Sequence, residues 1–176
     1  MRTAIADSVR LVVGSQAAWF ACVLGAARGW PWVGVVATAL WVAVWLRGRP
    51  RPRADLVFLA GVGAIGFVVD SGLVAAGAFG FPDHARLGGP SPLWMVALWV
   101  GFGTTVRTLG PALGVGAAAW IAAVALGALA GPLAYSGGVG LGAARFGEDA
   151  WRSRGIVAAA WAVAMPALVA WERRAR

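Results

Sequence analysis

Charged side chains are scarce in this chain. Only 12% of its 176 residues are charged, whereas 60% are hydrophobic. A typical soluble domain has about 25% charged and 45–50% apolar residues. The 15 basic and 7 acidic side chains are too few to give a soluble domain of this length a polar surface. The composition therefore excludes most soluble folds and indicates a single integral membrane domain over residues 1–176.

Lysine is absent, and cysteine and histidine each occur once. All 15 basic residues are arginine, which excludes a lysine nucleophile and a Schiff-base lysine. Cys22 has no second cysteine with which to form a disulfide within the chain. With His84 as the only histidine, a multi-histidine metal site is impossible. The sequence therefore predicts no metal site.

Apolar runs of the length needed to cross a membrane fill most of the chain, since a spanning helix needs about 20 mainly apolar residues. We predict an all-α, polytopic transmembrane helix bundle of about six spans. The predicted spans are residues 9–27, 30–46, 54–81, 92–109, 112–131 and 155–171. Ser15 and Gln16 interrupt the first run and a second run follows at once, which favours a retained span over a cleaved signal peptide.

The fifth apolar region, residues 112–144, is too long for one ordinary span and too short for two. Residues 131–142 contain five glycines and Pro132. Non-helical backbone at membrane depth persists only where it is buried in protein or faces water. We therefore predict a helix over 112–131, followed over 132–144 by a kinked or broken helix end or by a short re-entrant element.

The arginines indicate which loops face the cytoplasm. Residues 47–53 hold four arginines and two prolines, and the positive-inside rule places this segment in the cytoplasm. A net charge of +8 would suggest nucleic acid in a soluble protein. Here most arginines flank apolar runs, so we expect membrane lipids as partners and no nucleic acid. Six spans then place both termini in the cytoplasm.

One glycine pattern resembles a dinucleotide site. Residues 61–66 match G-x-G-x-x-G after a strand-like run. The match lies inside an uninterrupted apolar span, and no second strand–helix unit exists. Close helix packing explains these glycines better, so we predict no cofactor.

Asp70 is the only acidic residue well inside a predicted span. A charge in lipid costs about 2.5–3.5 kcal/mol on insertion scales. At about 100° per residue, Gly63 and Gly66 share its helix face, whereas Val68 projects the other way. We therefore expect Asp70 to face the bundle interior and to have a functional role. The alternative is a protonated or hydrogen-bonded structural aspartate.

Positions along the helix axes limit which residues can contact Asp70. An axial gap of roughly 13 Å separates it from Arg107, which we expect to extend to cytoplasmic headgroups instead. Tyr135 and Ser136 are better placed near the outer face. The candidate ligand-binding residues are Asp70, Ser71, Trp99, Thr104, Tyr135 and Ser136. Asp70 is also the one candidate catalytic residue.

Four of the 11 tryptophans lie deep in predicted spans rather than at their ends. They are Trp41, Trp99, Trp120 and Trp161. Such rings serve as packing or lipid-facing surface. They also suit the lining of a site for an apolar or cationic ligand. The sequence leaves both readings open.

Two segments resemble a known family. The first comprises Asp70-Ser71 and the tryptophan-rich run 92–99 that follows it in the sequence. The second is the run Gly-Pro-Leu-Ala-Tyr-Ser-Gly-Gly at residues 131–138. Together they are similar to DUF2878, a family of uncharacterised bacterial inner-membrane proteins. The resemblance implies a small multi-pass protein of that membrane, with no established activity. It also points toward lipids, because members look to be encoded alongside lipid-modifying enzymes.

Three functions remain open from the sequence. In the first, the protein binds or assists modification of a membrane-embedded lipid or isoprenoid, with Asp70 as general acid if it is an enzyme. In the second, it is a small transporter or channel coupled to protons or cations through Asp70. In the third, it is a non-catalytic scaffold that docks a membrane-protein partner or a second copy of itself.

Overall fold

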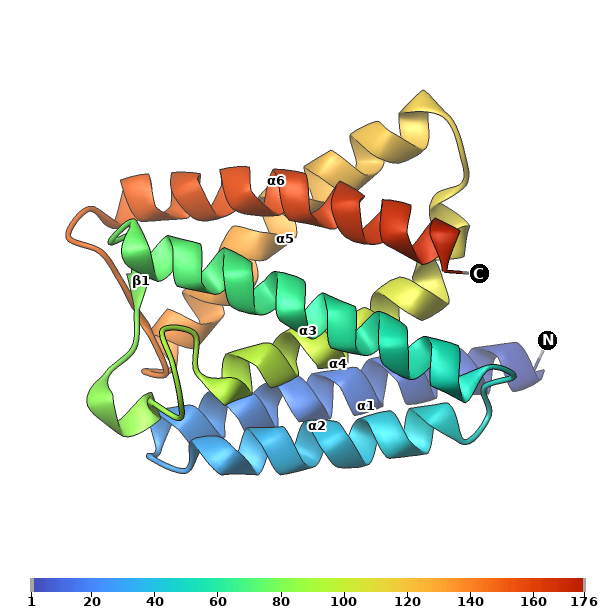
Figure 1. Ribbon diagram of the computed structural model, residues 1–176, viewed down its shortest axis with the longest axis horizontal. Coiled ribbons are helices and arrows are strands. Elements are labelled where there is room, and N and C mark those ends of the chain that lie inside the picture. The colour runs from blue at the N-terminus through green and yellow to red at the C-terminus, as the bar shows by residue number, and fades with distance from the viewer. Residues whose placement is uncertain (1, 176) are drawn as a thin grey trace.

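Six α-helices form a bundle in the part of the chain that the computed structural model describes, residues 2–175, with side chains from residue 9. They are α1 (Arg2–Ala27), α2 (Pro31–Leu46), α3 (Pro52–Ala75), α4 (Leu93–Leu109), α5 (Ala117–Gly140) and α6 (Ala150–Arg174). Successive helices run in opposite directions, so both termini lie at the same end (Figure 1). The predicted all-α bundle is confirmed.

Helix α4 is the central element. It packs against α1, α2 and α3, whereas α5 packs mainly against α6. Helix α6 lies on the far side of α3 from α2, and α5 crosses α3 obliquely in the view of Figure 1. Large aromatic side chains fill the core between these layers, among them Trp41, Trp94 and Trp99.

Four helices are long and apolar enough to cross a membrane. These segments are Val9–Ala27, Pro52–Ala75, Ala117–Gly140 and Ala150–Arg174. Helices α2 and α4 are shorter, with 16 and 17 residues. Large apolar side chains such as Val68, Leu133 and Val163 are exposed on the outside of the bundle, as expected for helices in contact with lipid.

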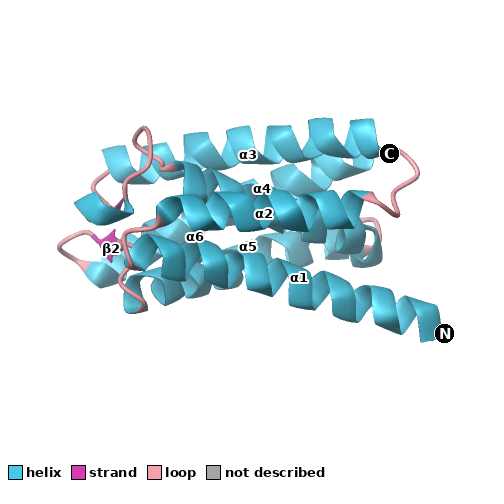
Figure 2. Cartoon of the chain, turned by 90° about the horizontal axis from the view of Figure 1, so that it is seen from below, coloured by secondary structure: helices cyan, strands magenta, loops and turns pink. Residues whose placement is uncertain are grey.

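A short pair of strands closes the end of the bundle opposite the termini. Strand β1 (Phe79–Gly80) pairs antiparallel with β2 (Arg145–Phe146), with Phe79 opposite Phe146. Figure 2 shows β2 at this end. The predicted third span ran to residue 81, but α3 ends at Ala75. The chain turns at Gly77, where φ is +66°, and then enters the strand pair.

Helix α5 runs without a break from Ala117 to Gly140 and contains Pro132. A break or a re-entrant element within 132–140 is therefore wrong, and the other predicted form, a single helix that contains Pro132, is the one observed. Proline removes a single backbone donor, and neighbouring helices and local adjustments compensate for such losses in membrane helices. The helix begins later than predicted because Gly114 and Gly116 adopt φ values of +72° and +87°.

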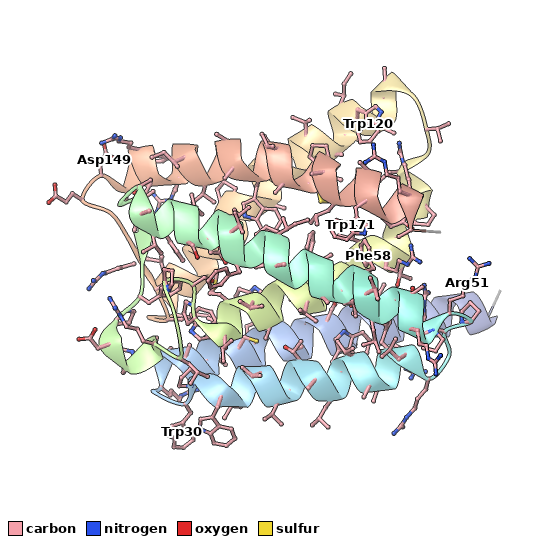
Figure 3. All side chains as sticks on the ribbon, viewed as in Figure 1. Trp30, Arg51, Phe58, Trp120, Asp149 and Trp171 are labelled. Carbon is pink, nitrogen blue, oxygen red and sulfur yellow. The ribbon has the colours of Figure 1, made fainter. Side chains whose placement is uncertain are left out.

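Helix α6 begins at Ala150, five residues before the predicted start of the last span at 155. The Asp149 carboxylate caps it by accepting hydrogen bonds from the backbone N–H groups of Trp151 and Arg152, at 2.9 and 3.0 Å. Such a cap stabilises a helix by about 1 kcal/mol. Figure 3 shows Asp149 at the end of the bundle opposite Arg51.

Candidate functional site

Asp70 lies on the face of α3 that points into the bundle. Its side chain is fully buried, as are Gly63 and Gly66 on the same face, whereas Val68 is exposed. The orientation predicted from helical periodicity is confirmed. A carboxylate at such a position needs hydrogen-bonding partners, because an unpaired polar group in an apolar interior is costly.

Neutral donors from two other helices supply those partners. Trp99 Nε1 on α4 donates a 2.9 Å hydrogen bond to Asp70 Oδ2. The Tyr135 hydroxyl on α5 donates to Oδ1. Ser91, just before α4, lies beside the same carboxylate, and its buried hydroxyl makes no hydrogen bond within residues 9–175. No salt bridge joins Asp70 to a described cationic side chain, so Asp70 is held by uncharged groups.

A stacked pair of indoles extends this network. The rings of Trp99 and Trp161 are parallel to within 17°, with centroids 4.5 Å apart. Trp161 also contacts the Tyr135 ring edge-on. Its Nε1 is buried and has no hydrogen-bond acceptor among the described side chains and backbone. The result is one continuous aromatic surface beside the Asp70–Tyr135 pair.

Two glycines make this arrangement possible. A methyl group on Gly66 of α3 would collide with the Trp99 ring, and one on Gly131 of α5 would collide with the Trp161 ring. Each glycine therefore lets a neighbouring helix place a large indole directly against backbone. Small residues have this role at many membrane helix interfaces.

The network forms one wall of a cleft of about 100 Å³, which we call the aromatic cleft. Its lining is almost entirely apolar and comes from α1, α4, α5, α6 and the segment around β1. The lining residues are Trp19, Val23, Phe79, Trp94, Met95, Leu98, Trp99, Phe102, Ala134, Tyr135, Gly138, Ala144 and Trp161. Asp70 lies behind Trp99 and Tyr135 rather than in the lining.

The strand pair packs against the end of the cleft that lies away from the termini. Phe79 in β1 packs on the Tyr135 ring with centroids 4.8 Å apart, and on Phe81 and Phe146. Trp94 packs edge-on against Phe81 and donates to the Ala85 carbonyl at 2.8 Å. These contacts hold the Tyr135 ring between the strand and the indole stack.

A family comparison identifies the chain. The model of the family described as "Protein of unknown function (DUF2878)" matches residues 8–167 of the 176. The chain belongs to the DUF2878 family. No curated protein and no solved structure matches it.

In this DUF2878 member, three of the six residues predicted for the site lie together. They are Asp70, Trp99 and Tyr135. The Ser71 hydroxyl is buried and lacks a hydrogen-bond partner in the described part of the chain. Ser71 is next to Asp70 in sequence, but it does not line the aromatic cleft.

The other two predicted residues make structural contacts elsewhere. The Thr104 hydroxyl donates to the Gly101 carbonyl at 2.7 Å and accepts from Trp41 Nε1 at 3.1 Å. Thr104 thus hydrogen-bonds both to the backbone of its own helix and to a side chain of α2. Ser136 Oγ accepts a 3.3 Å hydrogen bond from Arg154 Nε.

A buried ionic cluster at the end with the termini is the feature that sequence reasoning missed. Asp55, in the first turn of α3, accepts from Arg49 Nε and from Arg107 Nε, each at 2.8 Å. Arg107 also donates to the Glu172 side chain at 3.4 Å and to the Ala175 carbonyl at 2.9 Å. The expectation that Arg107 extends to lipid headgroups is wrong, since its side chain is only 6% exposed.

The reason for this error is the position of Asp55 in the sequence. It falls at the start of a predicted span, where an acid near the headgroups is unremarkable. Arg107 does not pair with Asp70, as predicted from their separation along the helix axes, and it pairs with Asp55 instead. Within residues 9–175, no group of three or more His, Cys, Asp or Glu side chains is placed to hold a metal ion.

Proposed function

We propose that this DUF2878 protein is a multi-pass protein of the bacterial inner membrane that binds a membrane-embedded lipid or isoprenoid in the aromatic cleft. The observation that carries the proposal is the cleft itself. It is lined by apolar and aromatic side chains from several helices, with one hydrogen-bonded polar pair, Tyr135 and Asp70, at its wall. Ligand sites typically combine a mostly apolar lining with a few placed polar groups.

The distribution of arginine supports the orientation with both termini in the cytoplasm. Arg47, Arg49, Arg51 and Arg53 lie in and beside the α2–α3 connection, at the same end of the bundle as the two termini (Figures 1 and 3). By the positive-inside rule, that end faces the cytoplasm. The aromatic cleft then lies in the outer half of the membrane.

The geometry also supports a part in modifying the bound lipid. A carboxyl group hydrogen-bonded to a phenol can hold a proton and pass it to an acceptor. Tyr135 lines the cleft and Asp70 lies directly behind it. The parallel faces of Trp99 and Trp161 would stabilise positive charge that develops on a hydrocarbon chain beside them.

The structure favours the transporter alternative less. Transporters commonly line their path with discontinuous helices, and α5 is continuous. No observation favours the scaffold alternative over the others, because contact with lipid explains the exposed apolar helix faces equally well. We therefore favour lipid binding.

Gly138 offers a direct test, because it lines the cleft and a Cβ atom there would meet no other atom within 4 Å. Gly138→Leu should fill the cleft without disturbing the bundle. The matched control is Gly140→Leu, two residues further along α5, where a Cβ is equally unobstructed and the cleft is not touched.

The measurement is mass spectrometry of the lipids that remain bound to protein purified from membranes. We expect a lipid species that is retained by the native protein and by Gly140→Leu and is lost from Gly138→Leu. Equal lipid content in all three proteins would refute the proposal. Comparative lipidomics of cells carrying Asp70→Asn or Tyr135→Phe then tests modification separately from binding.

A further inference from the structure

A second cavity continues the aromatic cleft toward the end with the termini. It has a volume of about 240 Å³ and lies between α1 and α4. Both cavities are lined by Trp19, Leu98 and Phe102. We call the second one the inner compartment. Its lining residues are Leu11, Val12, Ser15, Gln16, Ala18, Trp19, Thr38, Leu98, Gly101, Phe102, Thr105 and Leu109.

The two cavities together are long and narrow. On α4 their lining extends from Trp94 to Leu109, which is about 22 Å at the helical rise per residue. One leaflet of a bilayer has a hydrocarbon depth of only about 15 Å, half of the whole core. Each cavity is smaller than the pockets of roughly 300–1,000 Å³ that hold drug-sized ligands. The shape therefore suits one extended chain.

The inner compartment is lined by two hydrogen-bonding side chains, an amide and a hydroxyl, that have no partners among the described residues. The Gln16 side chain and the Thr105 hydroxyl line it, and neither makes a hydrogen bond to another described residue. Gln16 is exposed on α1, about 9 Å along the helix axis from Arg10. An amide left unpaired within a membrane span carries a substantial free-energy cost, which a polar group on a ligand would remove.

Charge in the inner compartment excludes one class of ligand. Among its described lining residues there is no arginine and no acid. A phosphate buried there would lose its hydration without gaining a cation, which is strongly unfavourable. An uncharged hydroxyl or carbonyl fits, because the Gln16 amide both donates and accepts hydrogen bonds and Thr105 does the same.

We infer that the ligand is a single-chain amphiphile with an uncharged polar end, such as a long-chain or isoprenoid alcohol. Its polar end hydrogen-bonds to Gln16 and Thr105, and its chain passes Trp19 and Phe102 into the aromatic cleft. This inference rests on the proposed function and names its ligand class. It places the far part of the chain, rather than the polar end, beside Tyr135.

The test uses a long-chain primary alcohol that carries a photoactivatable diazirine near its far end. Two analogues with the same chain, an alkane and a phosphate monoester, serve as comparisons. We expect the alcohol to label aromatic-cleft residues such as Met95, as located by mass spectrometry. The phosphate monoester should label them more weakly than the alcohol.

Substitution of the polar pair tests the anchoring. In Gln16→Leu/Thr105→Val, labelling by the alcohol relative to the alkane should fall about tenfold, the effect of losing roughly 1.4 kcal/mol of hydrogen bonding. The matched control is Ala17→Leu, an exposed neighbour on α1 outside the compartment, which should leave the ratio unchanged.

Failure of this inference can be told apart from failure of the proposed function. If Gly138→Leu blocks labelling but the double variant keeps the native ratio, or the phosphate monoester labels best, the ligand class is wrong and the cleft still binds lipid. Labelling near Leu11 or Leu109 would overturn the orientation of the chain. If no probe labels the cleft, or if Gly138→Leu has no effect, both proposals are wrong.

Discussion

Helix α3 carries two fully buried carboxylates, Asp55 and Asp70, in opposite environments. Asp55 sits between the guanidinium groups of Arg49 and Arg107, each at 2.8 Å. Asp70 is bound by an indole and a phenol, both uncharged. The first arrangement joins α3, α4 and the end of α6 by strong ion pairs. The second leaves a carboxyl group beside an apolar cleft without a described cation to neutralise it.

The difference shows that burial alone does not identify a functional acid. Asp55 has an electrostatic reason to be where it is, because its charge compensates arginines that would otherwise be buried unpaired. Asp70 has no such charge partner among the described residues. Under the proposed function it exchanges a proton with the bound ligand through Tyr135, which lines the cleft. We therefore interpret Asp55 as structural and Asp70 as functional.

The largest expected effect comes from removing the charge of Asp55. Asp55→Asn leaves Arg107, 7% exposed, without its main counter-ion and should lower the free energy of unfolding by about 3–5 kcal/mol. The measurement is reversible unfolding of purified protein in mixed micelles. Arg47→Ala, at an exposed position near the same end, is the control and should leave stability unchanged. If Asp55→Asn and Asp70→Asn cost the same, the contrast between the two carboxylates is wrong.

A smaller effect is expected from crowding the Asp70 end of the helix. Gly66→Ala forces its methyl group into the Trp99 ring, and overpacking of this kind costs about 1–3 kcal/mol. The displaced indole should also change the near-ultraviolet circular dichroism of the Trp99–Trp161 stack. Gly72→Ala, on the same helix with open space around its Cβ, should be neutral or slightly stabilising. Identical spectra for the two variants would contradict the close packing of Gly66 on Trp99.

Loss of one hydrogen bond from an uncharged donor to Asp70 should lower the free energy of unfolding by less than either of these substitutions. Tyr135→Phe removes the hydroxyl that donates to Asp70 and should lower the free energy of unfolding by about 1 kcal/mol. Asp70→Asn should have a cost of the same order, because the amide retains an acceptor for Trp99. A double-mutant cycle measures the coupling between the two residues. If Tyr135→Phe lowers the free energy of unfolding as much as Asp55→Asn does, the Tyr135–Asp70 pair has a mainly structural role.

The smallest effect is expected at an exposed ion pair. Asp83 and Arg86 lie 3.4 Å apart at the end of the bundle that carries the strands, and both side chains are largely exposed. Surface pairs contribute little to stability, so Asp83→Asn should leave the unfolding transition unchanged within error. A clear loss of stability would show that charge matters at this end as well, and would weaken the contrast between the two ends.

Much of the fold could be predicted from local patterns. Apolar runs located the helices, and Pro31 and Pro52 stand in the first turns of α2 and α3. The Gly-Pro step at residues 131–132 was misleading, because a proline in a packed membrane helix loses one hydrogen bond without ending the helix. Local rules describe what a peptide does in water, whereas α5 packs closely against α6 around Gly127 and Gly131.

The candidate site could be predicted only in part. Asp70 stood out because a carboxylate in an apolar run is costly, and periodicity oriented it correctly. The stacking of Trp161 on Trp99 could not be foreseen, since it depends on how α6 is positioned against α4 and on the space left by Gly66 and Gly131. The role proposed for Gln16 could not be predicted either, because it depends on the cavity that this side chain lines.

The sequence by itself determined that this chain forms a bundle of apolar helices, which end carries most of its arginines, and that Asp70 faces inward. These properties follow from composition and from the 3.6-residue period of the helix. Tertiary structure alone decided which partners each acid has. Asp55 and Asp70 are residues of the same type on the same helix. Only the packing of α4 and α5 against α3 places Arg107 beside the first and an indole and a phenol beside the second.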